Sequence, residues 1–229
     1  MFHSIFSAFA ACASASLLVH IDALSTRPIQ PSLTATVRNG TYVGIHSESY
    51  NQDFFLGVPF AQPPVGSLRF RSPQPLNETW SALRDANAYS ASCVGYGGDN
   101  LAYPSSSEDC LYLNIVRPSG YAEEKLPVAV WIHGGGYFMG SGIDQRYNLS
   151  RLVQQSVAIG KPIIGISINY RVSAWGFLSS QEVLQSGQTN LGLRDQHLAL
   201  EWIQENIAAF GGRCLKSPHS TRCTPLLVC

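Results

Sequence analysis

The clearest pattern along the chain is a pair of nearly uninterrupted apolar runs, Leu126–Ile132 and Pro162–Ile168. A strand that is covered on both faces has no polar side, so such runs predict buried strands of a parallel sheet, the first at Val128–Ile132. A third run, Leu111–Val116, predicts another strand that ends before Pro118. Helical patterns follow the two long runs, and this alternation of strands and helices is typical of an α/β protein.

Two helices are predicted from apolar residues at helical spacing. The first covers Tyr147–Ala158, and the second covers Arg194–Phe210. Gly211 follows the second helix, where a glycine can adopt the left-handed conformation that ends many helices. The apolar stripe of the second helix, which we expect to face the core, consists of Leu198, Trp202, Ile203, Ile207 and Phe210.

The beginning of the domain has the pattern of a hairpin. Leu33–Val37 and Tyr42–Ile45 flank Asn39-Gly40, a strong signal for a tight turn between antiparallel strands. Phe54–Val58 predicts one more strand. The proline-rich segment Gln62–Pro75 cannot join a central sheet, because prolines lack the backbone donor, so we expect it to run over the surface.

Composition narrows the class of protein. The chain has 229 residues, 45% of them hydrophobic and 13% charged, with a formal net charge of zero. These values describe a globular chain, and they favour neither nucleic acid nor an anionic membrane surface as a partner. We expect one domain over residues 33–212, followed by a tail of different character over residues 213–229.

The N-terminus predicts a secretory signal within residues 1–23. Ile5–Val19 is a short stretch of apolar and small residues, and Ala11-Cys-Ala13 and Ala13-Ser-Ala15 both offer cleavage sites. A short membrane anchor is the alternative, but the stretch is too short and too rich in Ala and Ser to span a bilayer well. Secretion would make three sequons available for glycosylation, at Asn39, Asn77 and Asn148.

The first long apolar run leads directly into His133-Gly134-Gly135-Gly136. Three glycines after a buried strand leave the backbone bare, so that its N–H groups can approach a substrate closely. Such donors stabilise the oxyanion that forms when a nucleophile attacks an ester, and this run is typical of the oxyanion loop of lipases and esterases. The alternative is a flexible glycine-rich turn.

Four further motifs stand around this loop in order, and together they resemble the type-B carboxylesterase family, which includes esterases, lipases and cholinesterases. The resemblance extends from about Val37 to Gly212. It implies the N-terminal portion of an α/β-hydrolase fold, with a mostly parallel central sheet that is incomplete here, since family chains are more than twice as long. The motifs are Gly57–Phe70, Ser107–Asn114, Asn169–Val172 and Asn190–Gln196.

The resemblance also implies an activity and several contacts. The activity is hydrolysis of a small-molecule carboxylic ester through an acyl-enzyme, without cofactor or metal, with Gly135 and Gly136 as oxyanion donors. A disulfide would join Cys93 and Cys110, with two free thiols as the alternative. Cys214, Cys223 and Cys229 remain unexplained. Two ion pairs are implied, Arg69 with Glu108 and Arg171 with Asp195.

The nucleophile of such an enzyme is missing from the sequence. A Gly-x-Ser-x-Gly elbow should follow Phe210-Gly-Gly212, but residues 213–229 contain no glycine and no evident apolar strand. Ser167 lies within a predicted strand, and Ser141 is too close to the glycine loop. Cys223 falls near the nucleophile position, but it lacks the flanking glycines.

A base is missing too, because His46, His197 and His219 all precede the part of the family sequence that supplies it. We therefore expect an inactive N-terminal fragment, whose reading frame leaves the family at Gly212 through a retained intron or a frameshift. The alternative is a catalytically dead binding or adhesion protein. Against that alternative, loss of the elbow strand and of everything after it should leave a sheet edge unpaired and apolar, which favours aggregation.

Overall fold

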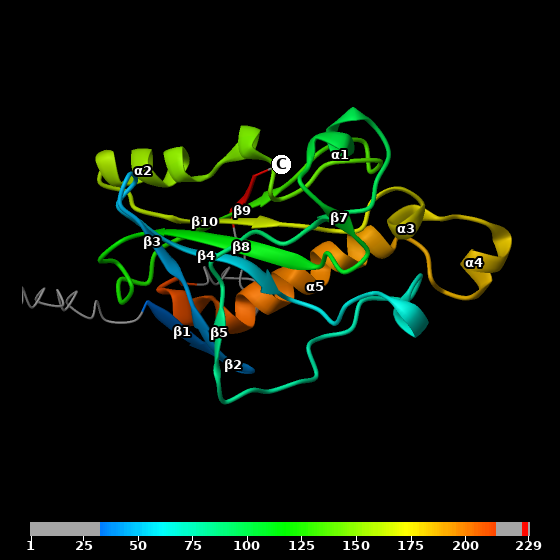
Figure 1. The fold of residues 1–229 in the computed structure, drawn as a ribbon, viewed down its shortest axis with the longest axis horizontal. Coiled ribbons are helices and arrows are strands. Elements are labelled where there is room, and N and C mark those ends of the chain that lie inside the picture. The colour runs from blue at the N-terminus through cyan, green and yellow to red at the C-terminus, as the bar shows by residue number, and fades with distance from the viewer. Residues whose placement is uncertain (1–32, 214–225, 229) are drawn as a thin grey trace, which may run out of the picture. The chain divides into compact units, whose positions relative to one another are not determined.

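The computed structural model describes residues 33–213 and 226–228. Its main element is a six-stranded sheet with the order β11-β9-β10-β8-β4-β3 (Figure 1). The apolar runs of the sequence form its centre, as predicted. The strands are β3 (Ile45–Ser47), β4 (Gln52–Pro59), β8 (Tyr112–Pro118), β9 (Val128–Ile132), β10 (Ile164–Ile168) and β11 (Leu226–Val228).

The described part of this sheet is mixed, so the expectation of a mostly parallel sheet holds at one edge only. β11, β9 and β10 run parallel to one another, whereas the pairings of β10 with β8, β8 with β4 and β4 with β3 are antiparallel. The difference follows from the connections. A helix carries the chain from β9 back to the start of β10, while β3 and β4 are joined by a short turn that reverses direction.

The N-terminal hairpin is confirmed, although its turn lies one residue earlier than predicted. β1 (Thr34–Val37) and β2 (Gly40–Val43) pair with Val37 opposite Gly40, so Arg38 and Asn39 make the turn. Gly40 is required for another reason: a Cβ there would lie 2.2 Å from Nε1 of Trp80. The hairpin forms its own sheet with β5 (Leu83–Asp85), and β6 (Ser92–Cys93) pairs with β7 (Ser106–Ser107).

The helices differ from the predictions mainly at their ends. The first predicted helix begins at Ser150 and not at Tyr147, because Asn148 Oδ1 accepts a hydrogen bond from Ser150 N (2.9 Å). The second begins earlier than predicted, and Gly211 ends its last turn with φ = 80°, as expected. The helices are α1 (Gly98–Ala102), α2 (Ser150–Ala158), α3 (Ser173–Phe177), α4 (Gln181–Gln185) and α5 (Leu191–Asn206), with 3-10 turns at Gly66–Leu68, Gln145–Tyr147 and Ile207–Phe210.

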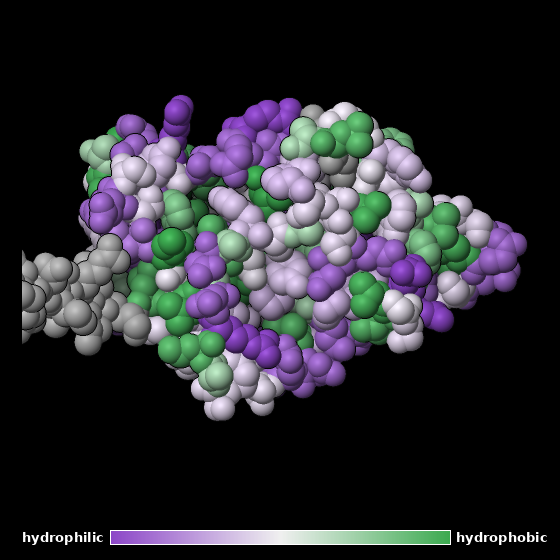
Figure 2. Space-filling model, viewed as in Figure 1, coloured by the Kyte–Doolittle hydropathy of each residue, from purple (hydrophilic) through white to green (hydrophobic). Residues whose placement is uncertain are grey.

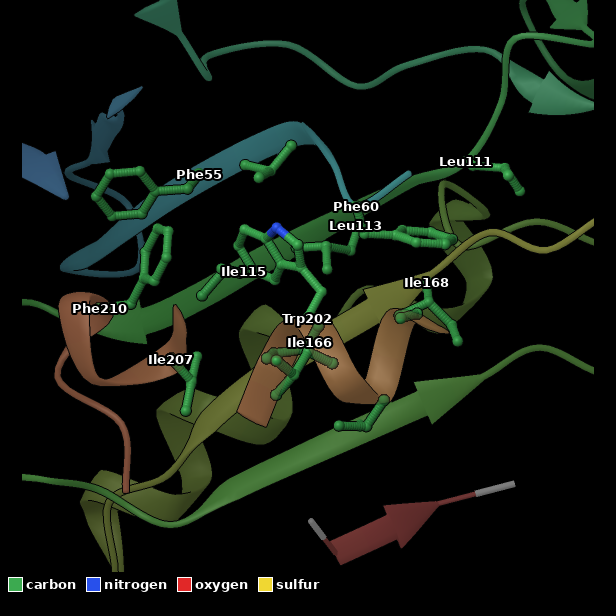
Figure 3. Close-up of a cluster of buried hydrophobic side chains, with 14 of the residues drawn as sticks. Phe55, Phe60, Leu111, Leu113, Ile115, Ile166, Ile168, Trp202, Ile207 and Phe210 are labelled. Atoms are coloured by element: carbon green, nitrogen blue, oxygen red, sulfur yellow. The ribbon is translucent and has the colours of Figure 1, made fainter. Parts of the chain in front are cut away.

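The sheet lies between two helical layers, with α2 on one face and α5 on the other (Figure 1). The predicted apolar stripe lies on α5 and on the 3-10 turn that follows it, and it points into the core, except that Leu198 is only partly buried. Figure 3 shows how aromatic residues from the sheet and from α5 meet there. The largest fully buried side chains include Phe55, Phe60, Phe210, Leu113, Ile115, Ile166 and Ile168.

The edge of β9 is paired, which corrects the expectation of an open apolar edge. Leu226–Val228 forms β11 and runs parallel to β9, with Leu227 opposite Val130. The tail after Gly212 therefore adds a strand to the sheet, although its sequence showed no evident one. On the face seen in Figure 2, apolar residues form small separate patches between hydrophilic ones.

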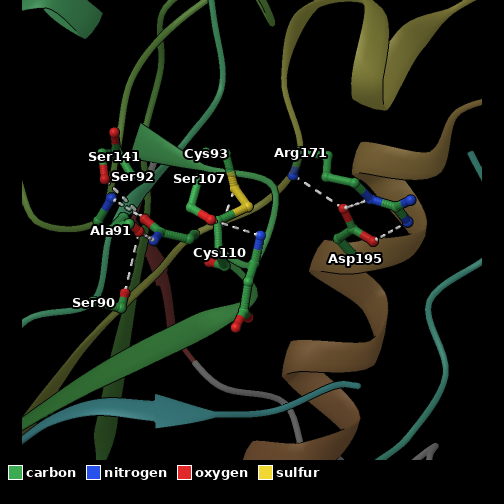
Figure 4. The surroundings of a disulfide bond; sticks show 12 residues. Ser90, Ala91, Ser92, Cys93, Ser107, Cys110, Ser141, Arg171 and Asp195 are labelled. Carbon is green, nitrogen blue, oxygen red and sulfur yellow. Dashed lines mark hydrogen bonds and ion pairs between the residues drawn. A yellow bond between two sulfur atoms is a disulfide. The ribbon is translucent and has the colours of Figure 1, made fainter. Parts of the chain in front are cut away.

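The disulfide between Cys93 and Cys110 is present (Figure 4). Replacing both cysteines with serine should lower the free energy of unfolding by about 3 kcal/mol, because the cross-link restricts the unfolded chain across the segment between them. Urea denaturation checks this value. Reductant should destabilise the unaltered chain to the same level and leave the double variant unchanged. Equal stability of the two oxidised proteins would contradict the expectation.

Candidate functional site

The glycine loop begins where β9 ends, at the carboxyl end of the central strands. Gly134, Gly135 and Gly136 are exposed, and His133 before them is buried. Gly135 (φ = 116°) and Gly136 (φ = 61°) have backbone angles that side chains disfavour. A Cβ on Gly135 would also lie 2.2 Å from the carbonyl oxygen of Met139. This position therefore requires glycine.

The loop is a tight turn whose amides are left without partners. Gly135 O accepts hydrogen bonds from the backbone N–H groups of Phe138 (3.0 Å) and Met139 (3.3 Å). The N–H groups of Gly135 and Gly136, by contrast, donate to no other group in the part of the chain that the structure describes. The local geometry thus leaves two adjacent donors available at an exposed position.

Three separate elements hold the loop in this shape. Ser173 N, at the start of α3, donates to Tyr137 O (2.6 Å), and both residues have positive φ. Tyr96 N, from the segment that the disulfide closes, donates to Phe138 O (2.9 Å). Tyr170 Oη donates to His133 O (2.8 Å). Such strained residues persist only when their surroundings over-determine them, which is common at functional sites.

A buried polar network anchors the far end of the loop. Asn169 Oδ1 accepts hydrogen bonds from Ser141 Oγ (2.9 Å) and Gly142 N (2.8 Å), and its Nδ2 donates to Ala91 O (3.0 Å). Ser167 Oγ donates to Gly142 O (2.7 Å). Both serine hydroxyls are thus hydrogen-bonded within the network. Ser167 is the one polar side chain within the apolar run Pro162–Ile168, and Asn169 directly follows that run. These two polar residues were the signal for the network that the sequence offered.

His133 lies under the loop as a neutral residue. It is 3% exposed, its ring stacks on Tyr170 with the centroids 4.2 Å apart, and its Nδ1 is 3.0 Å from Gly134 O. Its Nε2 is buried and has no hydrogen-bond partner among the described residues. Burial lowers the pKa of His133 from 6.5 to about 4, since the charged ring would lose its hydration there.

This shift of the His133 pKa predicts a pH-dependent stability. The unfolded chain takes up the proton at about 6.5 and the folded chain at about 4, so protonation favours unfolding. The free energy of unfolding is therefore unaffected by this protonation above pH 6.5. It decreases as the pH falls from 6.5 toward 4, by on the order of 3 kcal/mol in total. Urea unfolding at several pH values measures the free energy of unfolding as a function of pH. This pH profile should be flatter for His133→Phe than for the unaltered chain. His197→Gln is the matched control, because His197 is 63% exposed and should not change the profile.

The other histidines lie away from the loop or outside the described residues. His46 pairs with Asp53 (3.1 Å), which also pairs with Arg117, and His197 lies 3.6 Å from Glu201 on α5. His219 is outside the described residues, as are Cys214, Cys223 and Cys229. Within residues 33–213 and 226–228, no group of three His, Cys, Asp or Glu residues could hold a metal ion.

Both implied ion pairs are present. Arg69 Nε lies 2.5 Å from Glu108 Oε2 and is half exposed. Arg171 and Asp195 form a fully buried pair, in which Asp195 accepts from Nη2 (2.7 Å), from Nε (2.8 Å) and from the backbone N of Arg171 (3.0 Å) (Figure 4). This pair joins the segment after β10 to the first turn of α5. It therefore helps to place Ser173, which holds the glycine loop.

The remaining sequence predictions concern targeting and modification. The signal segment lies outside the described residues. Asn77 and Asn148 are exposed, while Asn39 is partly buried. Among the helices that the structure describes, none is both long and apolar enough to cross a bilayer.

Comparison with solved structures defines the class of fold. A thermophilic PNB esterase matches with a TM-score of 0.70 and 37% sequence identity, over 79% of this chain and 36% of that chain. A second PNB esterase matches with a TM-score of 0.69 and 38% identity. The chain therefore has the α/β-hydrolase fold, of which it contains a part.

Sequence comparison identifies the family. The model of the carboxylesterase family matches residues 31–214, and the chain belongs to this family. Lipase 1 of Geotrichum candidum is 43% identical over 188 residues, which cover 70% of this chain and 33% of that protein. Secreted lipase 1 of Botryotinia fuckeliana is 41% identical over 210 residues, covering 82% and 36%. The chain thus spans about a third of the length of these relatives.

Proposed function

We propose that this chain carries the oxyanion-binding part of a secreted carboxylic ester hydrolase. The observation that supports this most is the pair of unpartnered N–H groups at Gly135 and Gly136, held at the carboxyl end of β9. Each preorganised donor of this kind is worth roughly 3 kcal/mol of barrier, because it meets negative charge that develops only in the transition state. The family relatives named as lipases and esterases support esters as the substrate class.

In this proposal the donors act on the carbonyl oxygen of the ester. A serine supplied by residues outside these 229 attacks the carbonyl carbon, and the oxygen becomes an oxyanion that the amides of Gly135 and Gly136 bind. The alcohol leaves, and water then hydrolyses the acyl-enzyme. The Asn169 network and the Arg171–Asp195 pair position the loop, and no metal or cofactor takes part.

These 229 residues alone should not hydrolyse p-nitrophenyl esters, because they lack the nucleophile elbow. The measured rate should equal that of Gly135→Pro, which removes one donor and cannot adopt a φ of 116°. Hydrolysis by the unaltered chain that Gly135→Pro abolishes would overturn the expectation of inactivity.

A transcript that joins codon 212 to a Gly-x-Ser-x-Gly sequence would test the hydrolase itself. Its product should be active, and Gly135→Pro should lower kcat of that product by at least about 10²-fold. Equal kcat for the product and its Gly135→Pro variant would contradict the oxyanion role of the loop.

A catalytically dead binding protein is the second candidate, and the pairing of β11 with β9 favours it. This pairing covers the sheet edge that would otherwise promote aggregation. The two candidates are distinguished by the secreted product. A stable, monomeric product that ends at Cys229 supports the binding protein, whereas detection only of a longer, ester-cleaving product supports the hydrolase. Secretion also implies glycosylation at one or more of Asn39, Asn77 and Asn148.

A further inference from the structure

A cavity of about 440 Å³ lies away from the glycine loop, between α5, the turn of the β1–β2 hairpin and segment 75–79. The hairpin and α5 lie on the same side of the main sheet (Figure 1). The volume is within the range of small-molecule sites. None of the lining residues takes part in the proposed ester hydrolysis, so the cavity needs a different explanation.

The lining of the cavity combines apolar side chains with several carboxylates and with one cationic residue, Arg38. Phe60, Leu198 and Trp202 supply the apolar part. Glu201 and Glu205 stand one turn apart on α5, are both exposed and also line the cavity. Aromatic and aliphatic side chains pack against the C–H face of a sugar ring, while carboxylates accept hydrogen bonds from its hydroxyl and amide groups. The lining therefore suits a neutral sugar that offers both surfaces.

Two sequons meet at the rim of this cavity, and the structure distinguishes them. Asn39 is hydrogen-bonded to the neighbouring segment through both its side chain and its backbone. Its Nδ2 donates to Glu78 O (2.7 Å), and its backbone carbonyl accepts from Trp80 N (2.9 Å). Asn77 is exposed, lines the cavity, and makes no side-chain hydrogen bond within the described part of the chain. A glycan on Asn77 would therefore begin at the opening of the cavity.

We propose that Asn77 carries an N-linked glycan whose first N-acetylglucosamine units lie in this cavity, against Leu198 and the carboxylates of Glu201 and Glu205. The proposal rests on the secretory route of the proposed function, but not on ester hydrolysis. Failure of the hydrolase assay would therefore leave it intact.

The test uses the full chain, secreted from eukaryotic cells whose mannosidases are inhibited so that every glycan stays high-mannose. Mass spectrometry of peptides gives the occupancy of each sequon. Endoglycosidase H, which cleaves between the first two sugars, is then applied to native and to denatured protein. The glycan on Asn77 should be cleaved at least about tenfold more slowly in the native protein than in the denatured protein. This is the protection expected from one or two hydrogen bonds. For Asn148 the two rates should be similar.

A double variant, Glu201→Ala with Glu205→Ala, should remove the protection at Asn77. Glu123→Ala with Glu124→Ala is the matched control, because it makes the same change of charge at two exposed residues outside the cavity and should retain the protection. An unoccupied Asn77, equal native and denatured rates at Asn77, or protection that survives the Glu201/Glu205 variant would overturn the proposal. Absence of glycan from all three asparagines would overturn the secretory route as well.

Discussion

Asp195→Asn should lower the free energy of unfolding by about 3–5 kcal/mol, since it leaves the guanidinium of Arg171 buried without its counter-charge. The two side chains are 0% and 4% exposed, and three hydrogen bonds join the two residues. Asparagine has nearly the same shape as aspartate, so the loss cannot come from a cavity. Urea denaturation followed by circular dichroism measures it.

The matched control for Asp195→Asn is Glu108→Gln in the pair with Arg69. These side chains are 23% and 49% exposed, and pairs of this kind contribute about 1 kcal/mol or less. A similar loss of stability in both variants would show that burial does not determine the strength of the Arg171–Asp195 pair. A loss restricted to Asp195→Asn is expected.

Phe210→Ala should cost about 3–5 kcal/mol, because it removes a large side chain from the centre of the core and leaves a cavity. Phe210 is 0% exposed, and its ring contacts Phe55 edge-on with the centroids 4.9 Å apart (Figure 3). It also packs near Trp202, so it ties the last turn of the α5 segment to the sheet. The measurement is again the free energy of unfolding in urea.

Leu193→Ala is the control for Phe210→Ala, because Leu193 is 43% exposed on the outer side of α5. This variant also removes apolar side-chain atoms, but from a position that is already largely in water, so its effect should stay within about 0.5 kcal/mol. Comparable losses in the two variants would contradict the expectation that core packing determines the contribution of Phe210 to stability.

The stability of this core bears directly on the proposed oxyanion donors. The glycine loop has no secondary structure of its own, and it is held by Ser173, Tyr96 and Tyr170 from three different elements. Each of these elements is in turn fixed by the core, the disulfide or the Arg171–Asp195 pair. Variants that loosen these supports should therefore disturb the loop before the whole domain unfolds.

The sequence by itself determined the strands and helices with the strongest local patterns. The buried strands β9 and β10 follow from continuous apolar runs, and the end of the α5 segment follows from Gly211. The position of the glycine loop was also evident, because it directly follows the run that becomes β9. Such features depend on residues that are close in the chain, so a local pattern is sufficient to predict them.

Tertiary structure alone decided the features that join distant residues. Trp80 packs over Gly40, which lies at the start of β2 directly after the hairpin turn. β11 pairs with β9, although residues 213–229 show no evident strand pattern. The network around Asn169 likewise joins three segments of the chain. A buried donor or acceptor takes whatever partner the fold brings near it, and that partner has no fixed spacing in sequence. The local pattern therefore located the glycine loop, while long-range contacts determined its shape.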